Sequence, residues 1–139
     1  MTAGPRTILL VEDNPDDVEL TMLALERYRL GGRLAVATDG AEALELVISQ
    51  EATRFAFVML DLKLPKVSGH EVLKRVRANA PTGTLPVIVL TSSSEQEDMI
   101  DSYNRGANSY IRKPVDSDEF AAAVAQLGLY WAMLNETPD

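Results

Sequence analysis

Short apolar stretches alternate along this chain with longer segments in which apolar and polar residues are mixed. Five of the stretches have the length and the apolar or β-branched content of strands, namely Thr7–Val11, Leu34–Ala37, Phe57–Leu60, Pro86–Leu90 and Asn108–Ile111. The longer segments between them are typical of helices. Repeated alternation of strand and helix predicts an α/β fold in which a parallel sheet carries helices on both faces.

Helix-start residues follow the predicted strands. Asn14 offers an N-cap directly before Pro15, which suits the first position of a helix. Three further pairs have the spacing of a capping box, namely Asp39 with Glu42, Ser68 with Glu71, and Asp116 with Glu119. Gly106 is placed to end the helix that starts near Ser94.

The composition of the strands predicts their order in the sheet. The first, third and fourth stretches are almost continuously apolar, as expected for strands that are covered on both faces. The second and fifth carry or adjoin polar residues such as Arg33, Thr38 and Ser109, which indicates the edges. This division fits the order 2-1-3-4-5 of doubly wound, flavodoxin-like sheets, whose ligand crevice lies at the carboxyl ends of strands one and three.

Polar residues that can carry chemistry follow four of the predicted strands. They are Glu12 and Asp13 after the first, Asp61 after the third, Thr91 and Ser92 after the fourth, and Lys113 with Pro114 after the fifth. Each has an ordinary explanation when taken alone, as an acidic helix start, a turn residue or the beginning of a polar loop. Their joint occurrence at successive strand ends instead indicates one functional site.

The three acids of this set predict a divalent cation. Carboxylates that lie close together repel one another unless a counter-charge is present. Mg²⁺ suits them because it prefers oxygen ligands and uses one or two carboxylates together with water. We expect direct coordination by Asp13 and Asp61, a water-mediated role for Glu12, and a further ligand in the backbone carbonyl of Lys63.

A metal-bound carboxylate, a hydroxyl and an ammonium group around one crevice favour phosphoryl transfer. A cation neutralises phosphate oxygens and so allows an anion to approach an anionic nucleophile. Carboxylates that form aspartyl phosphates are a known class of nucleophile. Lys113 would then supply a fixed positive charge, and Thr91 would donate a hydrogen bond to a phosphoryl oxygen.

The same residues resemble the motifs of bacterial response-regulator receiver domains over essentially the whole chain. The matching segments are LLVEDN at 9–14, MLDLKLP at 59–65, Gly69, VLTS at 89–92 and YIRKP at 110–114. The resemblance implies a phosphoryl acceptor, a metal-binding set and a phosphate-binding set. The phosphoryl acceptor is Asp61. The metal-binding set, which would hold Mg²⁺, consists of Glu12, Asp13, Asp61 and the backbone carbonyl of Lys63. The phosphate-binding set consists of Leu62, Thr91, Ser92 and Lys113.

The resemblance also implies a switch. In receivers a threonine moves toward the new phosphoryl group and an aromatic residue turns inward, and these roles fall on Thr91 and Tyr110. The surface expected to change is formed by the fourth helix, the fifth strand and the fifth helix.

The partners that the resemblance implies are proteins. A sensor histidine kinase would donate the phosphoryl group, and the narrower similarity is to the stand-alone regulators of bacterial phytochromes. We interpret residues 1–139 as a single receiver domain without an output domain, so that output passes through a partner. An apolar stripe in the last predicted helix, which includes Trp131, either packs on the sheet or forms a homodimer, and we favour the dimer.

Composition and charge narrow the class of protein further. Of the residues 46% are apolar and none is cysteine, which permits a normal core and excludes disulfides and thiolate metal sites. The formal net charge of −8 disfavours nucleic-acid binding. The first apolar run is too short for a signal peptide or a membrane span, so we expect a soluble cytoplasmic protein.

Three alternative functions remain open but are less favoured by the residues. A receiver-like binding module without phosphorylation usually lacks one of the acids, the threonine or the lysine, and all are present here. An aspartyl-phosphate phosphohydrolase typically has a second acid two residues after the nucleophile, where this chain has Lys63. A nucleotide or flavin carrier would require a glycine- or serine-rich loop in place of Glu12 and Asp13. We therefore expect a signalling switch rather than an enzyme, and an exposed, inert role for the single histidine, His70.

Overall fold

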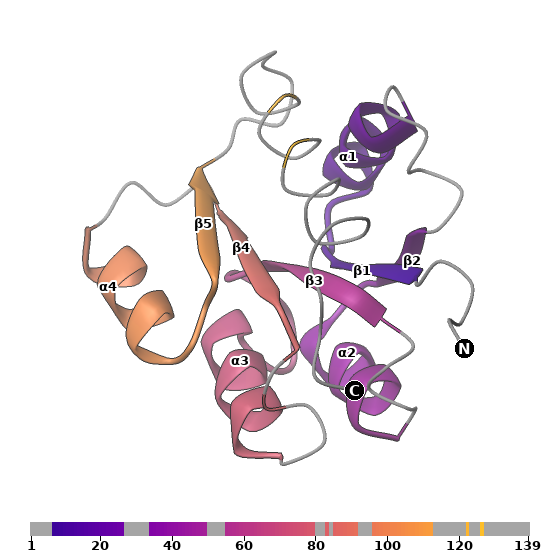
Figure 1. Ribbon diagram of the computed structural model, residues 1–139. Coiled ribbons are helices and arrows are strands. Elements are labelled where there is room, and N and C mark those ends of the chain that lie inside the picture. Colours follow the sequence, from indigo (N-terminus) through magenta and orange to yellow (C-terminus); the bar gives the residue numbers. More distant parts are fainter. Residues whose placement is uncertain are drawn as a thin grey trace, which may run out of the picture.

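The computed structural model describes residues 7–26, 34–49, 55–79, 83, 85–91, 96–112, 122 and 126. These residues contain a five-stranded parallel sheet in the order β2-β1-β3-β4-β5 (Figure 1). The strands are β1 (Thr7–Val11), β2 (Leu34–Ala37), β3 (Phe55–Asp61), β4 (Val87–Thr91) and β5 (Ser109–Arg112). The predicted strand order is confirmed, and β2 and β5 form the edges.

Helices cover both faces of this sheet. Those in the described part of the chain are α1 (Pro15–Glu26), α2 (Gly40–Ser49), α3 (Gly69–Ala78) and α4 (Gln96–Asn104). In Figure 1, α1 lies on one face, α2 and α3 lie on the other, and α4 lies beside β5. The structure therefore confirms the doubly wound, flavodoxin-like fold class.

The core consists of two apolar clusters, one on each face of the sheet. Alternate residues of a strand point to opposite faces, so Leu9 packs in the cluster that includes α2 and α3, while Ile8 packs in the cluster that includes Leu25 of α1. In β3 the alternation shifts by one residue, because Thr7 pairs with Phe55 but Ile8 pairs with Phe57. This irregularity lets two successive residues of β3 face the same cluster.

The strand boundaries differ slightly from those predicted. The third strand begins two residues earlier, at Phe55, which pairs with β1. The fourth begins at Val87 rather than Pro86, because proline has no N–H to donate to a sheet. The fifth begins after Asn108, whose side-chain oxygen accepts the N–H of Val87 at 2.8 Å.

The predicted helix ends are largely confirmed. The side chains of Asn14, Asp39 and Ser68 accept backbone N–H groups at the starts of α1, α2 and α3, at 2.9, 2.7 and 3.2 Å respectively. Gly106 has a positive φ of 102° just after α4, as predicted for a terminating glycine. The described part of α4 begins at Gln96, and the capping pair at 116 and 119 lies outside the described residues.

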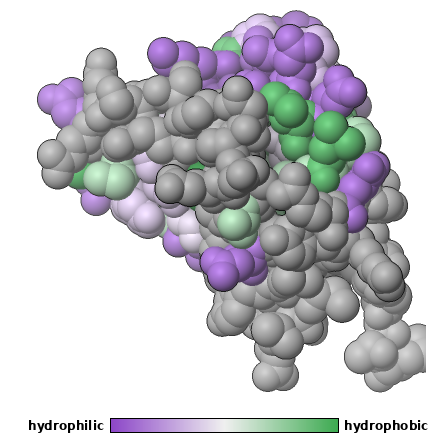
Figure 2. Space-filling view, turned by 90° about the horizontal axis from the view of Figure 1, so that it is seen from above, coloured by the Kyte–Doolittle hydropathy of each residue, from purple (hydrophilic) through white to green (hydrophobic). Residues whose placement is uncertain are grey.

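Helix α1 carries apolar side chains on more than one of its faces. Leu25 is buried in the apolar cluster on the sheet and Ala24 is also buried, whereas Leu23 is 52% exposed. Apolar side chains also gather among polar ones on the face of the molecule that is seen from above (Figure 2). Even so, no helix among the described residues is both long and apolar enough to cross a membrane.

At the amino end of the sheet, the side chain of Arg77 connects α3 to the starts of β4 and β5. Its guanidinium donates hydrogen bonds to the carbonyl oxygens of Gly106 and Leu85 and to Oδ1 of Asn108. Burial of the guanidinium lowers the pKa of Arg77. We call Arg77 with these three acceptors the arginine clamp.

Candidate functional site

The first part of the site lies just beyond β1. The N–H of Glu12 donates to the carbonyl of Ala37 at 3.0 Å, so the sheet pairing continues one residue past Val11 and fixes the backbone there. The Glu12 side chain is buried, at 2% exposure, and one of its oxygens accepts the N–H of Asn14 at 3.3 Å. Asp13 is exposed. The end of β1 therefore presents one buried and one solvated carboxylate.

The second part of the site is the last residue of β3. Asp61 is 6% exposed, and its Oδ1 accepts the backbone N–H of Lys63 at 3.3 Å. Because β1 and β3 are neighbours in the sheet, the carboxyl end of β3 lies beside Glu12 and Asp13. A buried carboxylate is thus placed next to a second one, which is rare unless charge is compensated.

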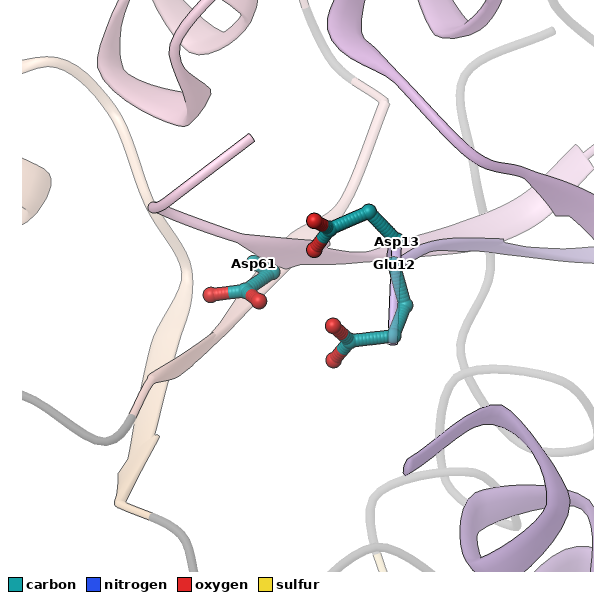
Figure 3. A group of neighbouring side chains, drawn as sticks. All are labelled: Glu12, Asp13 and Asp61. Carbon is teal, nitrogen blue, oxygen red and sulfur yellow. The ribbon is translucent and has the colours of Figure 1, made fainter. Parts of the chain in front are cut away.

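The three carboxylates form one cluster. Each residue offers an oxygen, and these oxygens of Glu12, Asp13 and Asp61 all lie within 4.8 Å of one another. In Figure 3 the three side chains extend from the ends of their strands and surround a common space. Two ligands on opposite sides of an octahedral Mg²⁺ are about 4.2 Å apart, so the cluster has the size and the hard oxygen donors that this ion needs.

The residues after Asp61 border the cluster. Leu62 is buried and its carbonyl accepts the N–H of Gly69 at 2.9 Å. A Cβ at Gly69 would lie 2.3 Å from the carbonyl oxygen of Asp61, so only glycine lets α3 start this close to the end of β3. The side chain of Lys63 is exposed, and its carbonyl remains a predicted metal ligand.

The switch residues lie on the two strands beside β3. Thr91 ends β4, is 1% exposed, and belongs to the strand that pairs with β3 up to Asp61. Tyr110 on β5 is half-buried and packs against the apolar cluster that includes α2 and α3. Ser92 and Lys113 lie outside the described residues, so their phosphate-binding roles stay predictions.

The prediction that His70 is exposed was wrong. Its side chain is half-buried, and Nε2 lies 3.3 Å from Oγ of Ser102 in α4. Because that hydroxyl donates to the carbonyl of Asp98 at 2.8 Å, Nε2 is the donor in the contact with His70. The partner is 32 residues away in the sequence, where no local pattern could indicate it.

Comparisons with known proteins agree with this geometry. Residues 8–125 match the model of the response regulator receiver domain family. The Methanothrix harundinacea protein named "Probable methanogenesis regulatory protein FilR2" is 37% identical over 137 residues, which cover 96% of this chain and 88% of that protein. Response regulator Rcp1 of Synechocystis is 32% identical over 91% of this chain and 89% of its own length.

Solved structures lead to the same family. The Mn²⁺-bound form of Rcp1 superposes with a TM-score of 0.84, at 31% identity, over 97% of this chain and all of that one. The bacteriophytochrome response regulator AtBRR is 46% identical, with a TM-score of 0.75, over 96% of this chain and all of that one. The protein is therefore a member of the response regulator receiver domain family and serves as a receiver in a phosphorelay.

Proposed function

We propose that Asp61 accepts a phosphoryl group from a sensor histidine kinase in a reaction that depends on Mg²⁺ bound by Glu12, Asp13 and Asp61. The observation that supports this most strongly is the cluster itself, in which carboxylate oxygens from two strand ends lie within 4.8 Å of one another. Two of these acids are buried, so their repulsion is poorly screened by solvent. An external cation is the simplest way to stabilise them.

Each residue of the site would have a separate role in the phosphoryl transfer. An oxygen of Asp61 forms a bond to phosphorus while the bond between phosphorus and the donor breaks, and the donor keeps the electron pair. The bound cation would neutralise phosphoryl oxygens and so reduce repulsion of the nucleophile. The hydroxyl of Thr91 would donate a hydrogen bond to a phosphoryl oxygen. Leu62, Ser92 and Lys113 would make the remaining contacts with the phosphoryl group. We expect no chemistry beyond this transfer and the hydrolysis of the aspartyl phosphate, in which water takes the phosphoryl group as inorganic phosphate and the carboxylate of Asp61 is regenerated.

Intact-mass analysis after incubation with Mg²⁺ and acetyl phosphate tests the assignment. We expect one labile phosphoryl adduct, which is absent with a chelator and absent in Asp61→Asn. Asp101→Asn, which removes an exposed acid of α4, is the matched control and should retain the adduct. An adduct that persists in Asp61→Asn, or one located on His70, would contradict the proposal.

The output surface would include α4 and β5. Tyr110 contacts the same apolar cluster that packs under α2 and α3, so a shift of Thr91 can reach it through neighbouring strands β4 and β5. Ile100 and Tyr103 of α4 are both 49% exposed, which makes α4 lightly anchored and available to a partner. Amide exchange in 96–112 should change on adding Mg²⁺ and a phosphoryl mimic, and unchanged exchange would exclude this surface.

Kinase identity and assembly complete the proposal. The 46% identity to AtBRR, a bacteriophytochrome response regulator, supports a phytochrome kinase as the donor. Transfer from a purified bacteriophytochrome kinase should outpace transfer from an unrelated kinase. We also propose a homodimer through the last predicted helix, whose apolar stripe includes Trp131; that residue lies outside the described residues. Trp131→Ala should shift the monomer–dimer balance in sedimentation toward monomer, and an unchanged balance would count against Trp131.

A further inference from the structure

The loop between β3 and α3, residues 62–68, makes a direct contact with the carboxylate of Asp61. The backbone N–H of Lys63 donates to Oδ1 of Asp61 at 3.3 Å, so a displacement of the loop changes the orientation of the side chain. The other end of the loop is held where the N–H of Gly69 donates to the carbonyl of Leu62 at 2.9 Å. Between these ends, Leu64 and Val67 pack against the apolar cluster that includes α2 and α3. Lys66 is exposed instead, so its backbone conformation needs a separate cause.

Lys66, in the middle of the loop, has an unfavourable backbone conformation. Its φ is 68°, and among the described non-glycine residues it is alone in having a positive φ. The N–H of Val67 donates to the carbonyl of Pro65 at 2.8 Å, which closes a γ-turn around Lys66. A γ-turn with positive φ is rare and strained, and such a conformation persists only where the surroundings hold it.

Two residues at the start of α2 provide that hold. Oδ2 of Asp39 lies 3.4 Å from Nζ of Lys66, while Oδ1 of the same carboxylate caps α2. The N–H of Gly40 donates to the carbonyl of Pro65 over a long 3.5 Å. A Cβ at Gly40 would lie 2.1 Å from the carbonyl oxygen of Val67, so the two backbones touch. We call Asp39, Gly40, Pro65, Lys66 and Val67 the loop latch.

We propose that Lys66 and Gly40 are positioning residues for the Mg²⁺ site, and that the loop latch sets the affinity for the ion by fixing the loop that orients Asp61. Backbone contact at Gly40 would carry most of the effect. The ion pair of Lys66 with Asp39 would carry less, because the lysine side chain is 69% exposed and such pairs contribute little. This role rests on the proposed function, since it presupposes that the carboxylate cluster binds Mg²⁺.

An NMR titration with MgCl₂, followed through backbone amide shifts, tests the latch without any phosphoryl donor. Gly40→Ala should weaken Mg²⁺ binding about tenfold, the size typical of changes behind the ligands of a metal. Lys66→Gly should weaken it as well, because it removes the ion pair with Asp39 and makes the loop backbone more flexible. Its melting temperature should nevertheless not fall below that of the wild type, because glycine adopts a positive φ without strain. A merely structural role would lower stability and affinity together. Lys66→Arg, which keeps a positive charge near Asp39, should retain near-native Mg²⁺ binding.

Gly106→Ala is the matched control. It introduces a methyl group 2.7 Å from the side chain of Arg77 at a positive φ, so it strains the fold at the opposite end of the sheet. It should lower the melting temperature and leave Mg²⁺ affinity unchanged. The latch is refuted if Gly40→Ala and Lys66→Gly both bind Mg²⁺ within about twofold of the wild type, or if Gly106→Ala weakens binding equally. A wild-type protein that binds no Mg²⁺ would instead refute the proposed function.

Discussion

The two ends of the sheet surround their charged side chains with opposite kinds of neighbour. At the amino end, the guanidinium of Arg77 donates hydrogen bonds to carbonyl and amide oxygens of the same chain, in the arginine clamp. At the carboxyl end, Glu12 and Asp61 are buried anions that lie beside each other and beside Asp13. The hydrogen bonds of Arg77 stabilise the fold, whereas like charges held close together make the carboxyl end respond to an ion from outside.

The largest expected effect comes from breaking the amino end. Arg77→Met removes the guanidinium and leaves the partly buried carbonyl groups of Leu85 and Gly106 without this donor. We expect the free energy of unfolding to fall by about 3 kcal/mol in urea denaturation. Mg²⁺ affinity should stay at the wild-type value because no carboxylate moves. A loss below about 1 kcal/mol would mean that the clamp is not a stabilising centre.

At the carboxyl end of the sheet, by contrast, we expect a substitution to raise the free energy of unfolding. Asp61→Asn removes one of the clustered charges and keeps an oxygen that can accept the N–H of Lys63. Since charges about 5 Å apart repel measurably even at a partly solvated site, the variant should be more stable than the wild type by about 1–2 kcal/mol in EDTA. Urea denaturation at low ionic strength measures this, with Asp101→Asn as the exposed control. A less stable Asp61→Asn would contradict the repulsion.

A smaller effect is expected at Thr91, which separates the acceptance of the phosphoryl group from the response to it. Thr91→Ala removes one hydrogen bond to the phosphoryl group and should slow adduct formation about fivefold. It should also abolish the change in amide exchange of α4 and β5. Thr91→Ser keeps the hydroxyl and should behave like the wild type in both assays. Equal exchange responses in the alanine variant and the wild type would remove Thr91 from the switch.

The smallest effect concerns pH. The pKa of Asp39 lies below its ordinary value of 3.8, first because the N–H of Glu42 donates to it and then because Lys66 is nearby. A lowered folded pKa gives stability that is complete above pH 4 and is lost as the pH falls further. The Asp39→Asn variant keeps a side-chain oxygen that can cap α2, but its side chain does not titrate. The stability difference between the two proteins should therefore shrink as the pH falls below 4, and a constant difference would contradict the lowered pKa of Asp39.

Much of the site could be predicted because its residues directly follow strands. Glu12, Asp13 and Asp61 are adjacent to apolar runs whose length and order are visible in the sequence, and parallel strands bring their carboxyl ends together. Contacts between distant segments were not predictable in the same way. Lys66 is not a residue type that marks positive φ, and its strain becomes understandable only once the start of α2 is seen against it.

The fold shows the same division. Continuously apolar stretches predicted which strands are central, yet the shift of one residue near Phe55 depends on pairing with β1 and leaves no local trace. The bond of His70 to Ser102 likewise joins α3 to α4 through tertiary structure alone. Apolar patterns within one helix or strand can be recognised in the sequence, whereas side-chain contacts between distant helices and strands become visible only in the three-dimensional structure.

The most direct measurement of the central claim is the change in unfolding free energy when Mg²⁺ is added. At concentrations well above the dissociation constant, the wild type and Arg77→Met should both gain about 1–3 kcal/mol, because only the folded state assembles the carboxylate cluster. Asp61→Asn should gain almost nothing. If the wild type shows no gain, or Asp61→Asn gains as much as the wild type, then the carboxyl end of the sheet is not the cation-dependent acceptor site.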